Sequence, residues 1–474
     1  MTRWAAVGAA YALVLAPGAL SAQFSPGARS VGMGGAGMVF ASGVDAIEWN
    51  PANLALGGGW NVSGEFGASG LLSGVTCDDV GAILGFGQCD TKPWGWNFDD
   101  VGCDASVTAG LPESGVRLST NSEGFLTAFG ADQADLPKPG SPLPTIGVAI
   151  GSVGVRVRSR VMTETTVSKE LLQLMCEGFD PALIQQYRVG DTGFRTTSFS
   201  EITAGYGTTL GDRLAVGIGL RYVMGHSLTQ GRFFEPVLDL TNESIEVTGV
   251  AIEATGGSGY GVDVGLALDV SSGLRVSASA TNIIQKMSWE EDLVAHQATY
   301  TGCIDGTAAC PGGDDFEQLG FEDFINRFEG QPISGGSLSL PVYRTAQELF
   351  RAAYFPTVLR AGAGWRAGGT SVELVGTSVS PRGRQHNDWD ERISLGVEQF
   401  LWILALRAGG ALGSDGLQAI NGGVGLGLGP VHLDMSGGIM SGGFDFASEF
   451  VTPENVEYAG AQITLSLQLK GGAR

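Results

Sequence analysis

The sequence predicts an all-β protein: an antiparallel transmembrane β-barrel of about 14 strands, with short helices in its loops. Three observations indicate this class. From Gly115 onward the chain breaks into segments of about ten residues with period-two hydrophobicity, each ended by turn-forming residues. Glycine supplies 76 of the 474 residues, which disfavours helices. After residue 22 the longest uncharged apolar run is Phe400 to Leu406, too short for a spanning helix.

The composition excludes several other classes of protein. With 43% apolar and only 16% charged residues, the chain is unlike a disordered protein. Its formal net charge of -22 argues against nucleic acid as a partner, because an acidic surface cannot neutralise phosphates. A soluble sandwich with this many strands would show domain boundaries, and none is visible. The apolar strand face is therefore expected to contact lipid.

The first 22 residues have the features of a secretory signal peptide. Arg3 precedes the uncharged stretch Trp4 to Leu20, and small residues follow up to Ala22, after which we expect cleavage. A short N-terminal membrane anchor is the alternative. We accordingly divide the chain into a signal peptide (1–22), an N-terminal segment (23–58) and an outer-membrane β-barrel (59–474).

Six cysteines in an exported chain predict disulfides. Cys303 and Cys310 enclose a Gly-rich polar segment and are the natural candidates for one loop disulfide. The other four permit three connectivities, among which the sequence does not choose. Three of them precede Asp, but their spacing matches no zinc pattern, so we expect no metal and no cofactor. These four are Cys77, Cys89, Cys103 and Cys176.

The clearest predicted hairpin joins Glu201 to Thr209 with Leu214 to Gly225 through a polar turn. In its second strand Val216, Ile218 and Leu220 share the face that we expect to meet lipid. Aromatic residues near strand ends would form interfacial girdles. These are Trp60, Tyr222, Trp365, Trp389, Phe400 and Trp402.

Three segments have helical rather than strand periodicity: Ser168 to Tyr187, Phe316 to Phe328, and Thr345 to Ala353. Helices within a barrel sequence belong to extracellular loops or to a plug.

A motif follows the proposed signal peptide. The Gly-rich run Gly32 to Gly37 formally satisfies a dinucleotide-binding pattern, but no strand precedes it, so that interpretation fails. Asp45-Ala46 and then Asn50-Pro51-Ala52 come after the run. This combination resembles the start of the FadL-type family of outer-membrane barrels, which includes long-chain fatty-acid and aromatic-hydrocarbon transporters and PorV-like proteins of a secretion system. The resemblance implies a 14-strand barrel whose N-terminal segment folds inward as a hatch.

The same resemblance implies that Asp45, Trp49, Asn50 and Pro51 belong to the hatch. Physically, Asn50 suits a turn or cap through its side-chain acceptor, and Pro51 suits the first residue of a helical turn. The alternative is that the segment merely fills and seals the lumen.

Three arginines, Arg156, Arg158 and Arg160, alternate with valines, which directs them to one strand face in the lumen. Arginine binds carboxylates bidentately, so these residues could hold a fatty-acid headgroup. The alternative, which we favour, is that they neutralise acidic residues in the lumen.

His432, Asp434 and Ser436 also share a strand face and comprise the residue types of a hydrolytic triad. Neighbours on one face lie about 7 Å apart, too far for a direct hydrogen bond between Ser and His. We therefore expect no enzyme, and a phospholipase is only the third hypothesis.

The expected function is passive uptake of hydrophobic, fatty-acid-like small molecules through a hatch-gated lumen in the bacterial outer membrane. The alternative is a PorV-like surface barrel that binds or assembles exported proteins. Expected partners are outer-membrane lipid and lipopolysaccharide, a hydrophobic ligand, and in the alternative an exported protein.

Overall fold

The computed structural model describes residues 27–73, 116–123, 145–168, 192–233, 237–239, 244–303, 329–332, 340–352, 356–380, 390–413, 418–442 and 458–471. The predicted signal peptide lies outside these residues, as do Trp389, the predicted helix 316–328 and all but Ser168 of the predicted helix 168–187.

Seventeen strands within the described residues form one sheet. They are β1 (Trp60–Ser73), β2 (Val116–Glu123), β3 (Thr145–Ile150), β4 (Val153–Val167), β5 (Gly193–Leu210), β6 (Leu214–Phe233), β7 (Val237–Asp239), β8 (Ser244–Ser271), β9 (Leu274–Cys303), β10 (Glu329–Pro332), β11 (Val358–Ala367), β12 (Thr370–Val379), β13 (Asp390–Leu401), β14 (Leu404–Gly413), β15 (Gln418–Leu428), β16 (Val431–Gly442) and β17 (Tyr458–Gly471).

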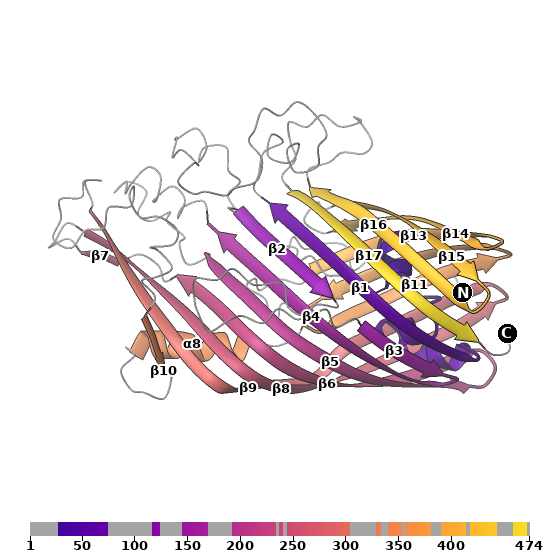
Figure 1. Cartoon of the computed structure of the whole chain (residues 1–474), viewed down its shortest axis with the longest axis horizontal. Helices are drawn as coiled ribbons and strands as arrows, with labels where there is room; N and C mark the ends of the chain where they lie inside the picture. The colour runs from indigo at the N-terminus through magenta and orange to yellow at the C-terminus, as the bar shows by residue number, and fades with distance from the viewer. Residues whose placement is uncertain are drawn as a thin grey trace, which may run out of the picture.

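The sheet closes on itself because the first strand pairs with the last. β1 is antiparallel to β17, from Trp60 opposite Gly471 to Ser73 opposite Tyr458. Three pairs of strands each share one position in the wall, since both members pair with the same neighbour: β2 with β3, β6 with β7, and β10 with β11. The described strands therefore form a closed antiparallel barrel of 14 strand positions, which confirms the predicted fold class (Figure 1).

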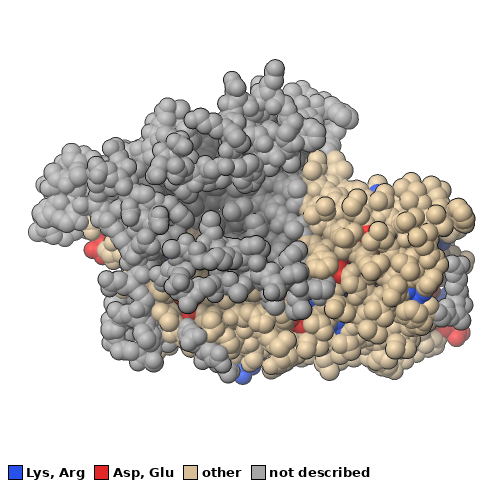
Figure 2. Space-filling model, viewed as in Figure 1, with Lys and Arg blue, Asp and Glu red and all other residues tan. Residues whose placement is uncertain are grey.

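The two faces of the wall differ in chemistry. Large apolar side chains alternate along the outer face, for example Leu395 on β13, Ile420 on β15 and Leu465 on β17, each about half exposed. In Figure 2 the described part of the surface shows few charged residues. Such a continuous apolar exterior would aggregate in water but suits the hydrocarbon of a bilayer.

The aromatic residues of the predicted girdles that the structure describes lie on this outer surface. Trp60, Tyr222, Trp365, Phe400 and Trp402 are all exposed, and Trp402 is the most exposed of them at 95%. Trp60, Trp365, Phe400 and Trp402 lie at one end of the barrel, beside its short turns. This position is where an interfacial girdle belongs.

The two ends of the barrel have different connections. At one end, strands are joined by turns of two or three residues, as between Leu210 and Leu214, Leu401 and Leu404, and Leu428 and Val431. At the other end the connections are longer, such as the one from Ser73 to Val116. In outer-membrane barrels the short turns face the periplasm and the long loops face outward.

The second strand position is interrupted. β2 ends at Glu123, opposite Gly67 of β1, and β3 begins at Thr145, opposite Glu65. Among the described residues, the pairing of β1 on this side therefore omits Phe66. β2 thus ends and β3 begins at neighbouring positions along β1.

One helix, α8 (Leu340–Ala352), confirms the predicted helical segment 345–353 and begins five residues earlier. It packs against β8 and β9 through Ala346 and Leu349. No described helix is long and apolar enough to cross a membrane.

Candidate ligand passage

The N-terminal segment lies inside the barrel at the short-turn end (Figure 1). It consists of α2 (Ala28–Gly32), α3 (Val44–Trp49) and the 3-10 helix η1 (Pro51–Leu56). α2 contacts β14, β15, β16 and β17, whereas η1 contacts β5, β6 and β8 on the other side of the wall. We name residues 27–58 the lumenal segment. Most of its side chains are buried, including those of Met33, Met38, Ile47 and Trp49.

Glycines on the inner wall form a seat for the Asn50-Pro51-Ala52 motif. A Cβ atom at Gly265 would lie 1.9 Å from Asn50 Oδ1, and one at Gly217 would lie 2.2 Å from the Ala52 nitrogen. No other residue fits at such distances. The abundance of glycine therefore has a local cause here, because the wall lets the backbone of the segment approach it.

Asn50 caps η1, as the sequence predicts. Its Oδ1 accepts a hydrogen bond from the Ala52 amide at 3.1 Å, and Pro51 occupies the first turn. Its Nδ2 donates to the carbonyl oxygen of Leu266 on β8 at 2.8 Å. One side chain thus fixes both the turn and its attachment to the wall.

Glu48 joins α3 to the wall by buried ion pairs. Its carboxylate lies 2.9 Å from Arg158 on β4 and 3.7 Å from Arg221 on β6. Glu201 on β5 bridges the same two arginines at 2.5 and 2.6 Å, and Asp263 on β8 lies 2.9 Å from Arg221. This set, which we name the lumenal ion cluster, contains three carboxylates and two guanidinium groups.

Burial alone would raise the pKa of Glu48, but the arginines around it outweigh that effect and hold its pKa well below the usual range. The four that act on it are Arg158, Arg221, Arg156 and Arg160. Glu48 is therefore ionised at neutral pH.

A second group of ion pairs holds the other end of the lumenal segment. Arg29 of α2 lies 2.8 Å from Glu373 on β12 and 3.0 Å from Glu398 on β13. Glu373 also accepts a hydrogen bond from the Val39 amide at 2.7 Å. Arg407 on β14 completes the group at 2.7 Å from Glu398. Both ends of the segment are therefore attached by charge.

The remaining predicted hatch residues lie in the same region. Trp49 is buried, and the Arg360 guanidinium lies 4.9 Å from the centre of its ring. Asp45 accepts a long hydrogen bond of 3.4 Å from Gln468 on β17. Asp45, Trp49, Asn50 and Pro51 are thus brought together in the lumen, but their contacts are with the wall.

The three predicted arginines lie on β4. Arg156 and Arg158 are buried and face the lumen, while the intervening valines are exposed on the outer face. Arg156 lies 3.0 Å from Glu65, so the carboxylates around Arg156 and Arg158 come from the protein itself. Arg160 is partly buried one step further along the strand. These contacts favour the neutralising role over the headgroup role.

On the long-loop side of the ion cluster, the inner face of the wall becomes apolar. Along the inner face of β6, Gly217 adjoins the lumenal segment, Arg221 belongs to the ion cluster and Val223 belongs to a buried apolar cluster. We name it the lumenal apolar cluster. Its largest members come from four strands, and α8 covers it. They are Phe199, Leu228, Ile252, Met287 and Trp289.

The residues of the hydrolytic hypothesis are used in other contacts. Asp434 lies 2.6 Å from Arg407 Nη1, and Ser436 donates a hydrogen bond to the Ala28 carbonyl. Neither contact prepares a nucleophile.

Five of the six predicted disulfide cysteines lie outside the described residues. They are Cys77, Cys89, Cys103, Cys176 and Cys310. Cys303 ends β9, and its pairing stays a prediction.

Sequence analysis did not single out the carboxylates of these ion pairs. Glu48 stands between two residues that were selected, but its partners lie more than a hundred positions away. A usable signal exists in the strands: Glu201, Asp263, Glu373 and Glu398 are charged residues at inward positions of otherwise apolar or Gly-rich segments. In a membrane barrel such positions indicate a polar lumen.

Comparison with known proteins supports the fold of the chain. Residues 143–235 match a family of unknown function, DUF5723. No curated protein sequence matches the chain. The chain is similar in structure to the toluene transporter TbuX of Ralstonia pickettii, with a TM-score of 0.51, 14% identity, and coverage of 94% of this chain and 98% of that one.

Two further structures are similar at lower TM-scores. The CymD monoaromatic hydrocarbon channel has a TM-score of 0.49 and 13% identity, with 94% of this chain and 97% of that chain covered. A FadL homologue of Pseudomonas aeruginosa also has a TM-score of 0.49, at 10% identity, with 93% and 97% covered.

The closed wall and its apolar outer face define an outer-membrane-type β-barrel that holds its own N-terminal segment in the lumen. The fold of this chain is similar to that of the toluene transporter TbuX, so the barrel that the resemblance implies is confirmed at the level of fold.

Proposed function

We propose that the protein lets hydrophobic small molecules pass inward through the bacterial outer membrane, and that the lumenal segment is the gate. The observation that carries this proposal is the order of surfaces along the lumen. The lumenal apolar cluster on the long-loop side is followed by the ion cluster and then by the lumenal segment in its glycine seat. The similar fold of a toluene transporter supports the same function.

The lumenal apolar cluster supports the proposed ligand class. It combines large apolar and aromatic side chains, including Phe199 and Trp289, whose surfaces suit apolar molecules by area and aromatic ones by stacking. A hydrocarbon entering from the long-loop side loses its hydration there. It then meets the ion cluster, which is polar and closed.

The gate follows from how the lumenal segment is held. Its attachments are ion pairs, hydrogen bonds and close backbone contacts, with no covalent link among the described residues. The fold needs no energy source for such a movement, because diffusion down a gradient suffices.

A reversible lock tests the gate. A Cβ atom at Gly32 would lie 2.9 Å from Ser436 Oγ, a separation that suits a disulfide between cysteines placed at both positions. We expect cells carrying Gly32→Cys with Ser436→Cys to take up toluene only after reduction. Each single variant is the control, and should be indifferent to reductant. Equal uptake by the oxidised and reduced double variant would refute the gate.

The PorV-like alternative makes a different prediction. A barrel that holds exported proteins through its loops needs no movement of the lumenal segment, so the lock would not alter partner binding. Co-purification of one exported protein with both the oxidised and the reduced variant, without toluene uptake, would support it. Lipid and lipopolysaccharide contacts remain predictions that neither experiment addresses.

A further inference from the structure

We propose that the lumenal apolar cluster recognises an uncharged carbonyl oxygen, and that Trp289 of β9 donates the hydrogen bond. The site takes a ketone or an ester whose remaining surface is apolar. This inference rests on the proposed function, because it identifies which hydrophobic molecules the cluster selects. It adds a specificity-determining residue to a surface that otherwise binds by area alone.

The indole nitrogen of Trp289 is a buried donor without an acceptor. The residue is 8% exposed, and its Nε1 has no hydrogen-bond partner in the part of the chain that the structure describes. Unpaired buried donors are rare in native proteins, because the group loses its hydration and gains nothing in return. The buried Nε1 therefore points to an acceptor that comes from outside the chain.

Two glycines fix the direction of the indole ring. A Cβ atom at Gly225 on β6 would lie 2.6 Å from Cζ3 and Cη2 of Trp289, and one at Gly257 on β8 would lie 2.7 Å from Cε3. The edge of the ring that carries these carbons therefore lies against the wall. Nε1 is on the opposite side of the indole, so it points away from both glycines.

The neighbours of Trp289 in the cluster are apolar, and they include Phe199, Ile252 and Met287. A buried water molecule needs about two to four polar partners, whereas the indole offers one. A carbonyl oxygen needs only a donor, and its apolar substituents suit the same side chains. The methyl group of Met287 lies against the same two glycines as the ring, and its flexible thioether can adapt to the shape of a ligand.

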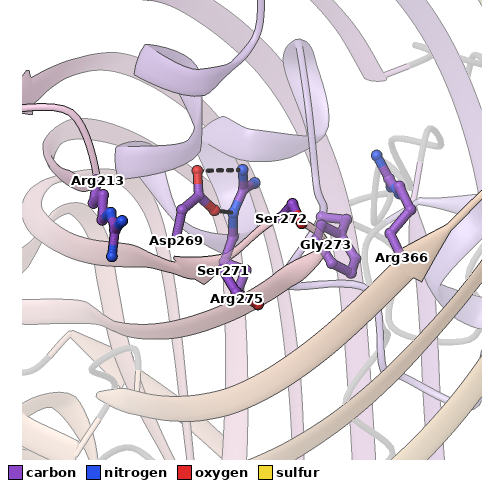
Figure 3. Close-up of a pocket in the computed structure, with 8 residues that line it drawn as sticks. Arg213, Asp269, Ser271, Ser272, Gly273, Arg275 and Arg366 are labelled. Atoms are coloured by element: carbon purple, nitrogen blue, oxygen red, sulfur yellow. Dashed lines mark hydrogen bonds and ion pairs between the residues drawn. The ribbon is translucent and has the colours of Figure 1, made fainter.

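Charged groups lie outside the cluster. Arg160 of β4 stands opposite Phe199 and has an interaction of its own, and the guanidinium groups of the lumenal ion cluster are paired with its carboxylates. A pocket at the short-turn end is also charged, and in it Arg275 donates to Asp269 at 2.7 Å (Figure 3). The charged residues that line this pocket are Arg213, Asp269, Arg275 and Arg366. A carboxylate at Trp289 would therefore lose its hydration without gaining a cation of the cluster.

A second uncharged polar group lies between Trp289 and the ion cluster. Gln285 is four positions earlier on the same face of β9, and both polar atoms of its amide are buried without a partner among the described residues. It stands opposite Gly261, where a Cβ atom would lie 3.5 Å from the Cβ of Arg221. A carbonyl compound that leaves Trp289 thus meets another uncharged donor before it reaches the ion cluster.

Two shape-matched probes test the site on the purified full chain in neutral detergent. They are para-fluoroacetophenone and para-fluoro-α-methylstyrene, in which a methylene group replaces the carbonyl oxygen. Fluorine NMR measures the affinity of each. We expect the ketone to bind about tenfold more tightly than the alkene. Trp289→Phe keeps an aromatic ring and removes the donor, so it should bind both probes about equally. Trp365→Phe, on the outer face, is the control and should keep the preference.

Two further measurements separate recognition from a folding defect. Trp289→His restores a ring N–H and should recover part of the preference for the ketone. In the unaltered protein, the ketone should shift one tryptophan indole N–H signal downfield and the alkene should not. para-Fluorobenzoate, a carboxylate of similar size, should bind more weakly than the ketone. Tighter binding of the benzoate would show that the site is charged and would overturn the assignment.

The outcomes distinguish this inference from the proposed function. A preference for the ketone that disappears in Trp289→Phe and returns in part in Trp289→His supports the site. Equal affinity of the two probes in the unaltered protein, or a preference that survives in Trp289→Phe, overturns the site while toluene uptake leaves the proposed function standing. Binding of the ketone through Trp289 without uptake of toluene or of either probe would refute the proposed function alone.

Discussion

Arg158 of the barrel wall and Glu48 of the lumenal segment form an ion pair of 2.9 Å that is almost completely buried. Arg158 also pairs with Glu201, so the segment adds its carboxylate to a group that is already charged. Buried pairs of this kind contribute little net stability relative to apolar packing, but removing one partner is costly. The arrangement therefore makes the position of the segment specific while leaving it separable from the wall.

Glu48→Gln is expected to weaken docking of the lumenal segment without unfolding the barrel. The loss should be about 1.5–3 kcal/mol, the range for a hydrogen bond to a charged group, because Glu201 and Asp263 still compensate the arginines. Hydrogen exchange of amides 44–56 should accelerate at least about tenfold. Glu246→Gln, at an exposed position of β8, is the matched control. Unchanged protection in Glu48→Gln would contradict the role assigned to the pair.

The docking should also depend on pH in one direction. The arginines hold the pKa of Glu48 below its ordinary value, so its contribution is complete above about 4.3 and disappears as pH falls through the lower, folded-state pKa. We expect constant protection of residues 44–56 from pH 7 to about 5, after correction for intrinsic exchange, and loosening only below that range. Glu48→Gln should lack the acid transition. Loosening of the wild type between pH 7 and 5 would show that another group controls it.

Gly265→Ala should displace the Asn50 motif. Its new Cβ would lie 1.9 Å from Asn50 Oδ1, so Asn50 must move and lose its bond to Leu266. Overpacking of this type costs about 1–3 kcal/mol. Thermal unfolding of the purified protein and toluene uptake by cells measure the effect, with lower stability and faster uptake expected. Gly64→Ala is the control because its Cβ would meet no atom within 4 Å. Equal behaviour of the two variants would argue against the seat.

The outer face should show the depth dependence of a lipid-embedded wall. Val424 lies midway along β15 on the exposed face, and Leu428 lies at its short turn. We expect Val424→Arg to destabilise the barrel in lipid vesicles by about 2–4 kcal/mol and Leu428→Arg by only about 0–1 kcal/mol. Denaturant unfolding in vesicles measures both. Similar costs at the two positions would mean that this face does not span a bilayer.

Strand periodicity sufficed to predict much of the wall. Ile463, Leu465 and Leu467 alternate with small polar residues, and the structure places the first set outward and buries the second. Arg156 and Arg158 are inward for the same reason. A strand with period-two alternation can turn either of its two faces toward lipid, and only the apolar face is stable against the bilayer.

The site was less predictable because its contacts join residues far apart in sequence. The Asn50-Pro51 turn is local, so its cap was predictable from residue type. Its seat on Gly217 and Gly265 was not, since any of the many glycines could have served. Nor does the sequence tell which of its acids meets Arg158.

By itself, the sequence determined the barrel class, the direction of the strand faces and the local turn at Asn50, because each depends on neighbours a few residues apart. Only the tertiary structure decided that Glu48 pairs with Arg158 and that Arg213 and Arg366 share one cavity. Closure of the barrel sets those distances. Which side chains meet across the lumen depends on the strand register summed over all fourteen strand positions of the closed barrel.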